Sequence, residues 1–316
     1  MALEEETGSG LEGVAVVALD SSGRRVLMRL TGPGGDYELR LPNGGEFVLR
    51  TDRIGYRTTT SARISVGTGD TIVHNLTISS QPVVLPALSV VADSRCDSPT
   101  SASTAVLWTE VRKTLELTSH AWQQDYYRYD VARFERQYGL DRRTVVSDRR
   151  WYDSTNTIRA FQSAEVETLL EGGFVQTQET ETTYFGPDAD VILSDSFLAE
   201  YCFFVVPGDD PDRIGLGFRP VKSHDVPQVE GVLWLGRESA SLEQLSFSYV
   251  GLDVPGAETA GGEVEYDQVD SGRWIVRRWA VRAPILWLKD TGEVLFDGVR
   301  EVGGRVRDVY RGGGNR

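Results

Sequence analysis

Turn-forming segments recur about every 8–12 residues through the first part of the chain, and this rhythm restricts its fold more than any other feature. The turns read Ser-Ser-Gly, Thr-Gly-Pro-Gly-Gly and Gly-Thr-Gly-Asp, with alternating apolar and polar residues between them. Tyr37, Leu39 and Leu41, for example, fall on one face of an expected strand, with charged residues on the other. Short alternating strands at this spacing are typical of a β-sandwich, which we expect over residues 1–92.

A helix is expected after a Ser-, Thr- and Pro-rich linker at residues 93–103. Ser101 or Ser103 can cap its first turn, because a serine hydroxyl accepts a hydrogen bond from the free N–H groups there. Its apolar side chains share one stripe at a spacing of three or four residues, which predicts one buried face: Ala105, Trp108, Val111, Leu115, Thr118 and Trp122.

β patterning returns after this helix and continues almost to the end of the chain. We expect strands over 126–139, 143–153 and 174–185, and hairpins through 230–252, 261–284 and 286–310. Short helices are expected at 163–170 and at 187–201, where Pro187 lies near the start of the second. The predicted fold is therefore mainly β: a sandwich, an α+β domain at 104–310 with a curved antiparallel sheet and a few helices, and a disordered tail at 311–316.

The net charge of −14 excludes some classes of partner. Residues 1–95 carry a net charge of −2 and the remainder −12, whereas a phosphate-binding surface needs positive charge, so we expect no nucleic acid partner. No apolar run reaches the roughly 18 residues of a membrane span. The acidic N-terminus is not a signal peptide, so the chain is either cytosolic or has lost a leader.

About 80 residues within the expected sandwich at 1–92 resemble the carboxypeptidase regulatory-like domain, a transthyretin-like sandwich. The resemblance depends on "TGSGLEGVAVVALD", on the turn before "YELRLP" and on "RIGYR". It implies a non-catalytic appendage, and some relatives bind carbohydrate, for which Tyr37 or Tyr56 would be candidates here. The family opens with a strand for which only "MALEEE" remains, so we expect that edge strand to be short, absent or supplied by another chain.

Two segments further along resemble bacterial envelope proteins. "GVLWLGRESASLEQLSFSYVGL" is similar to a hairpin of the lipoprotein-localisation (LolA/LppX-like) proteins, whose curved sheet wraps a helix and encloses an apolar groove for acyl chains. "YFGPDADVILSDSFLAEYCF" and "GRWIVRRWAVRAP" resemble an uncharacterised family of Gram-negative envelope proteins. These resemblances imply a protein on the periplasmic or extracellular side of the envelope, with its leader removed.

The two cysteines suggest a disulfide between Cys96 and Cys202 if the compartment is oxidising. The alternative is one buried thiol and one exposed thiol. No metal-binding motif joins the three histidines, and no catalytic motif is found, so we expect no cofactor and no enzyme. A calcium site is one interpretation of two acidic loops, and helix-terminal or solvated charge is the other: Asp188, Asp190, Asp195, Asp209, Asp210 and Asp212.

Aromatic and basic residues concentrate in the C-terminal strands. They can form core, line a groove for an apolar ligand, or make a partner interface: Trp234, Trp274, Trp279, Trp287, Arg277 and Arg278. The first hypothesis for function is a non-enzymatic envelope scaffold that docks onto a partner protein or membrane-bound assembly. The alternatives are a periplasmic carrier for a lipid or other apolar ligand, and carbohydrate binding by the sandwich.

Overall fold

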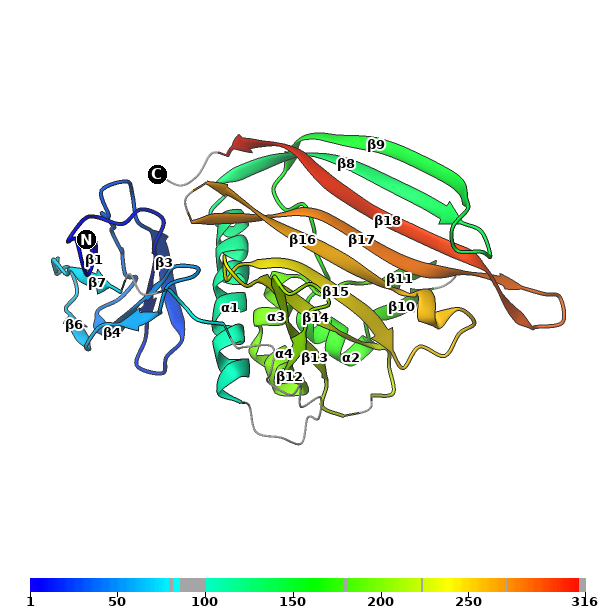
Figure 1. Cartoon of the computed structure of the whole chain (residues 1–316), viewed down its shortest axis with the longest axis horizontal. Helices are drawn as coiled ribbons and strands as arrows, with labels where there is room; N and C mark the ends of the chain where they lie inside the picture. Colours follow the sequence, from blue (N-terminus) through cyan, green and yellow to red (C-terminus); the bar gives the residue numbers. More distant parts are fainter. Residues whose placement is uncertain (80–81, 86–100, 179–180, 223, 271, 313–316) are drawn as a thin grey trace.

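The computed structural model describes residues 1–79, 82–85, 101–178, 181–222, 224–270 and 272–312, and the fold is mainly β, as predicted. The N-terminal strands form an antiparallel sheet in the order β3-β2-β4-β5, with β6 paired to β4, and a separate parallel pair of β1 and β7 (Figure 1). Their bounds are β1 Ala2–Glu4, β2 Ala15–Leu19, β3 Arg25–Leu30, β4 Gly45–Asp52, β5 Thr59–Thr60, β6 Ile64–Val66 and β7 Leu76–Ile78.

Two details of this region differ from the simple pattern. The opening strand is present but short, because β1 contributes only Ala2–Glu4 against β7. The strand expected at residues 36–41 is wrong, since the segment joins no ladder. Its alternation nevertheless holds: Tyr37, Leu39 and Leu41 are half-buried against the sandwich core, and the Tyr37 hydroxyl donates to the carbonyl of His74 at 2.8 Å. Side-chain packing, not main-chain pairing, fixes this segment.

The long helix α1, Ala102–Gln123, lies between these strands and the rest of the molecule (Figure 1). Ser101 is its N-cap, and the Ser101 hydroxyl accepts from the Thr104 N–H at 3.1 Å. The predicted single stripe is only partly right. Ala105 is exposed, whereas the charged residues Glu110 and Lys113 are buried. The helix is covered on more than one side, so its polar face also lies against protein.

The second β region is one antiparallel sheet, called the large sheet below, in the order β12-β13-β14-β15-β16-β17-β18-β8-β9. It curves over α1 (Figure 1). Its strands are β8 Tyr127–Tyr138, β9 Val145–Thr157, β12 Tyr201–Pro207, β13 Arg213–Pro220, β14 Gln228–Gly236, β15 Leu242–Val250, β16 Gly261–Asp270, β17 Arg273–Leu288 and β18 Val294–Arg311. Arg311 therefore ends a strand, which shortens the predicted tail, and residues 313–316 lie outside the described part.

Short elements connect these strands. They are α2 Val166–Gly172, the hairpin β10 Val175–Gln178 with β11 Glu181–Tyr184, α3 Ala189–Leu193, α4 Asp195–Glu200 and the 3-10 turn η1 Ala257–Thr259. The single helix expected at 187–201 is wrong, because the chain is extended at Ser194. The Ser194 hydroxyl accepts from the Phe197 N–H at 3.1 Å and so caps a new helix instead of continuing the old one.

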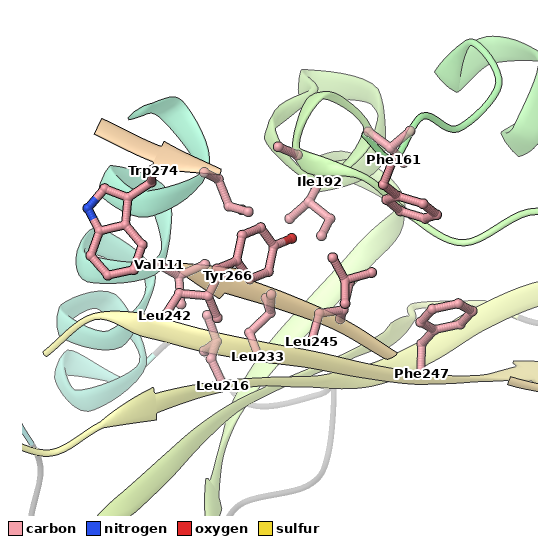
Figure 2. Packing of buried hydrophobic residues seen from close by; sticks show 14 of the residues in the cluster. Val111, Phe161, Ile192, Leu216, Leu233, Leu242, Leu245, Phe247, Tyr266 and Trp274 are labelled. Atoms are coloured by element: carbon pink, nitrogen blue, oxygen red, sulfur yellow. The ribbon is translucent and has the colours of Figure 1, made fainter. Parts of the chain in front are cut away.

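The main hydrophobic core lies between α1 and the concave face of the large sheet. Figure 2 shows Val111 of α1 among Leu216, Leu233, Leu242 and Leu245 of the sheet. The same cluster includes Ala15, Val17 and Met28 of β2 and β3. One continuous core therefore joins the N-terminal sheet to the large sheet through α1. None of the helices in the described residues has both the length and the apolar character that a membrane span requires.

Candidate functional surfaces

Buried charges fasten α1 to the N-terminal sheet. The Lys113 ammonium is fully buried and donates to Glu110 Oε1 at 2.6 Å, to the Tyr56 carbonyl at 2.6 Å and to the Arg53 carbonyl at 3.1 Å. Glu110 Oε2 accepts from the Gly55 N–H at 3.1 Å. Burial lowers the pKa of Lys113 and raises that of Glu110. All three hydrogens of the ammonium have acceptors, so this lysine is a structural anchor without a free reactive form.

A second charged group extends the same contact. Asp52 is buried and contacts Arg50 at 2.7 Å and Arg112 at 3.2 Å, while both arginines also contact Glu116. Burial opposes ionisation of Asp52, but the charges of Arg112 and Arg50 outweigh it, so the pKa of this carboxyl lies below its usual range. Two arginines against two carboxylates leave the group neutral, as a buried ion network requires.

Hydrogen bonds and an ion pair fix the acidic loop that contains Asp188. Asp188 Oδ1 accepts from the N–H groups of Asp190 and Val191 and so caps α3, and its Oδ2 accepts from Arg159 at 2.7 Å. Asp195 lies in the first turn of α4. Among the described residues no three carboxylate, histidine or cysteine side chains gather where they could hold a metal ion. Asp188 at the start of α3 and Asp195 in the first turn of α4 therefore lie where the interpretation as helix-terminal charge expects them.

The other acidic loop, at the turn between β12 and β13, also hydrogen-bonds internally. The Asp212 N–H donates to Asp210 Oδ1 at 2.9 Å, and Asp209 is exposed beside them. Of the predicted cysteine pair, Cys202 lies on β12 opposite Arg219, and Cys96 lies outside the described residues. The pairing therefore stays a prediction.

A small cavity lies beside Arg159, under the concave face of the large sheet. It has a volume of about 30 Å³ and is lined by Trp122, Tyr129, Asp188 and Ile275, among others. The Arg159 guanidinium lies over the Trp122 ring, 4.4 Å from its centroid. A volume of this size holds about one or two water molecules and no acyl chain. This cavity gives no support to a lipid carrier of the LolA kind.

The predicted tryptophans divide between core and surface. Trp274 and Trp279 are buried, and Trp279 packs against Phe161 with ring centroids 6.0 Å apart. Arg277 pairs with Asp267 at 2.8 Å, and Arg278 pairs with Glu263 and Glu265. Trp234 is half-buried on the opposite, outer face of the sheet, where its Nε1–H donates to Ser246 Oγ at 3.1 Å.

Trp287 belongs to a third environment, at the projecting end of the hairpin β17–β18 (Figure 1). It is 62% exposed and Leu288 is 67% exposed, although the hairpin register pairs them with Leu295 and Val294. Successive side chains of a strand point to opposite faces, so both faces of this hairpin end are apolar. Leu286 and Val294 are exposed there as well.

The turn of the neighbouring hairpin, β8–β9, adds to this surface. Leu140, Val145 and Val146 are exposed, and the Arg142 guanidinium lies 5.4 Å from the centroid of the Phe296 ring on β18. We call the surface formed by these two hairpin ends the distal tip: Leu140, Val145, Val146, Leu286, Trp287, Leu288 and Val294. Beside it β9 is the last strand of the large sheet, so its outer main-chain edge is unpaired within the described chain.

Two adjoining depressions lie on the outer face of the large sheet and share Arg219 and Glu230 as lining residues. The first has a volume of about 450 Å³ and is lined by Phe204, Phe218, Gly231, Val232, Ser246, Phe247 and Ser248 in addition. The second has a volume of about 350 Å³ and is lined by Pro220, Val221, Lys222, His224, Val226, Gln228, Val250 and Gly251 in addition. We call them together the outer groove.

Sequence reasoning missed the outer groove, although one signal of it was present. Gly215 and Gly217 alternate on β13 and so face the same side as Arg219. A Cβ at Gly217 would lie 2.4 Å from the Phe204 ring, and one at Gly215 would lie 2.4 Å from Val232. The missing side chains let Phe204 and Val232, which line the groove, lie close over β13. Glycine within a strand often marks such a close approach, so these two glycines were the local sign of where two of the groove's walls lie.

The comparisons with known proteins add no assignment. No protein-family model matches the chain, and the curated proteins include no significant match to it.

Proposed function

We propose that this protein is a non-enzymatic docking module of the bacterial envelope, which binds a partner protein through the distal tip. The observation that carries the proposal is the β17–β18 hairpin end, where Trp287 and Leu288 project with more than half of their surface exposed. Tryptophan is enriched at the centres of protein interfaces, and exposed apolar patches on folded proteins mark interaction sites. The envelope location comes from the sequence resemblance alone.

The chemistry of the hairpin turn favours a protein partner over insertion into a bilayer. Lys289 and Glu293 form an ion pair of 2.7 Å at the turn, and Asp290 lies between them in sequence. Insertion would carry these charges through hydrocarbon ahead of the apolar stem, which is costly. A protein cleft can instead contact both apolar faces of the stem and leave the charged turn in water.

The sandwich is a weaker candidate for the docking surface. An edge strand supplied by another chain would have favoured docking there, but Ala2–Glu4 of this chain form β1 and pair with β7. Tyr37 packs on the sandwich core, and the Tyr56 ring lies 4.4 Å beneath the Arg53 guanidinium. Both rings are half-buried, so neither offers an open platform for a sugar.

Site-specific photocrosslinking tests the proposal. We would place benzoylphenylalanine at Trp287, and at Val73 as a matched control, because Val73 is 88% exposed on the sandwich. In the cells that produce the protein, the Trp287 position is expected to yield a discrete crosslinked species and the Val73 position none. Adding Leu288→Ser should remove that species without changing the fold, because Leu288 is 67% exposed. The same crosslinked species from both positions, or from Val73 alone, contradicts the proposal.

A further inference from the structure

The outer groove contains an amide donor for which the described residues supply no acceptor. Gln228 is only 1% exposed and lines the groove, yet its Nε2 has no hydrogen-bond partner in the part of the chain that the structure describes. The other end of this amide is fixed, because Gln228 Oε1 accepts from the Tyr201 hydroxyl at 3.0 Å. Because the amide oxygen faces the Tyr201 hydroxyl, the amide nitrogen points away from it. An unsatisfied buried amide is costly unless an acceptor completes it.

Positive charge surrounds this amide. Arg219 and Lys222 line the groove together with His224, whose Nε2 is also buried and has no hydrogen-bond partner among the described residues. Among the lining residues that the structure describes, Lys222 and Arg219 carry permanent positive charge and Glu230 is the one carboxylate. In a chain with a net charge of −14 this is an unusual local balance, and it favours an anionic ligand.

The remaining walls are apolar. Pro220, Val221, Val226 and Val250 border the cationic end, and Phe204 and Val232 border the other. The Arg219 guanidinium lies 5.3 Å from the centroid of the Phe204 ring, at the point where the two depressions meet. The volume of each depression lies in the range of small-molecule sites.

We propose that the outer groove binds an organic carboxylate with an apolar body. Its carboxylate oxygens accept from the Gln228 amide and from Lys222 and Arg219, and its apolar body lies along Val226, Val250 and Val232. A carboxylate accepts several hydrogen bonds at once, which matches the clustered donors. This site is separate from the distal tip, so it does not depend on the proposed function.

Isothermal titration of the purified full chain with octanoate tests the inference, with acetate and 1-octanol as partial probes. Octanoate is expected to bind at one site per chain. Acetate lacks the apolar body and octanol lacks the charge, so each should bind at least about tenfold more weakly. Lys222→Gln and Arg219→Gln should each weaken octanoate binding by about tenfold or more, because each removes a charge-assisted hydrogen bond.

Arg63→Gln is the matched control, because Arg63 is an exposed arginine on the sandwich, with 70% of its side chain exposed. It should leave octanoate binding unchanged. The inference is overturned if octanoate gives no saturable binding up to millimolar concentration, if octanol or acetate binds equally well, or if Lys222→Gln and Arg219→Gln bind octanoate as tightly as the Arg63→Gln control. Methyl chemical shifts of Val226 and Val250 must also move with octanoate, and unmoved shifts place the ligand elsewhere and refute the assignment.

Discussion

Removing the Lys113 ammonium should be among the most damaging single changes on the polar side of α1. In Lys113→Met the stem is kept, but contacts of 2.6, 2.6 and 3.1 Å are lost and the Glu110 carboxylate stays buried without its cation. Breaking a buried ion pair from one side costs about 3–5 kcal/mol, because the remaining charge keeps its full desolvation penalty. We therefore expect the free energy of unfolding to fall by about 3–5 kcal/mol.

Two further variants separate burial from the ion pair itself. Lys289→Met makes the same change in an ion pair of 2.7 Å whose side chains are 43% and 57% exposed, and it should cost less than about 1 kcal/mol. The double variant Glu110→Gln with Lys113→Met should recover about 1–3 kcal/mol of the loss, since the neutral amide is cheaper to bury and still accepts from Gly55.

Urea denaturation followed by tryptophan fluorescence and far-UV circular dichroism measures all three variants. The reasoning is refuted if Lys113→Met is within about 1 kcal/mol of Lys289→Met, or if the double variant is no more stable than the single one.

The remaining predictions concern the two ends of α1. Burial and the nearby Arg29, Arg25 and Arg273 lower the pKa of His120 from 6.5 to about 3, so between these values the unfolded chain binds a proton that the folded chain does not. The free energy of unfolding should therefore be unaffected by His120 above pH 6.5 and should fall by about 2 kcal/mol when the pH is lowered to 5. His120→Leu should remove this part of the pH dependence, as measured by urea denaturation at pH 7 and pH 5. An unchanged pH dependence in the variant would contradict the prediction. Ser101→Ala should cost about 1 kcal/mol through the lost N-cap, whereas Ser103→Ala should cost little, and equal losses in thermal unfolding would contradict the cap assignment.

Local signals in the sequence predicted those features that depend on neighbouring residues. The start of α1 follows from a serine hydroxyl ahead of an apolar repeat, and the C-terminal hairpins follow from turn residues between alternating strands. The break at Ser194 used an equally local signal, a serine that can cap, but the acidic residues around it also suit a continuous helix. The sequence favoured a continuous helix, whereas in the structure α3 ends at Leu193 and Ser194 caps the separate helix α4.

Features that depend on long-range packing were not predictable in this way. Glu110 and Lys113 are charged residues of the kind expected on a solvent-exposed helix face. They are buried because the carbonyls of Arg53 and Tyr56, on a loop remote in sequence, accept hydrogen bonds from the Lys113 ammonium. Residues 36–41 alternate like a strand but pair with no neighbouring strand of the described chain. The outer groove requires β12–β15 to be aligned in register before Arg219, Glu230 and Gln228 can be seen as neighbours.

The order of strands in the large sheet has a consequence for biosynthesis. β18 lies between β17 and β8, so the last strand of the sheet to leave the ribosome must pair with the first one made. Until β18 is made, both edges of the β8–β9 hairpin are unpaired. The pairing of β18 with β8 joins residues far apart along the polypeptide, and such long-range contacts slow folding. Nascent chains that stop before β18 should accordingly be the aggregation-prone species and the natural clients of a chaperone.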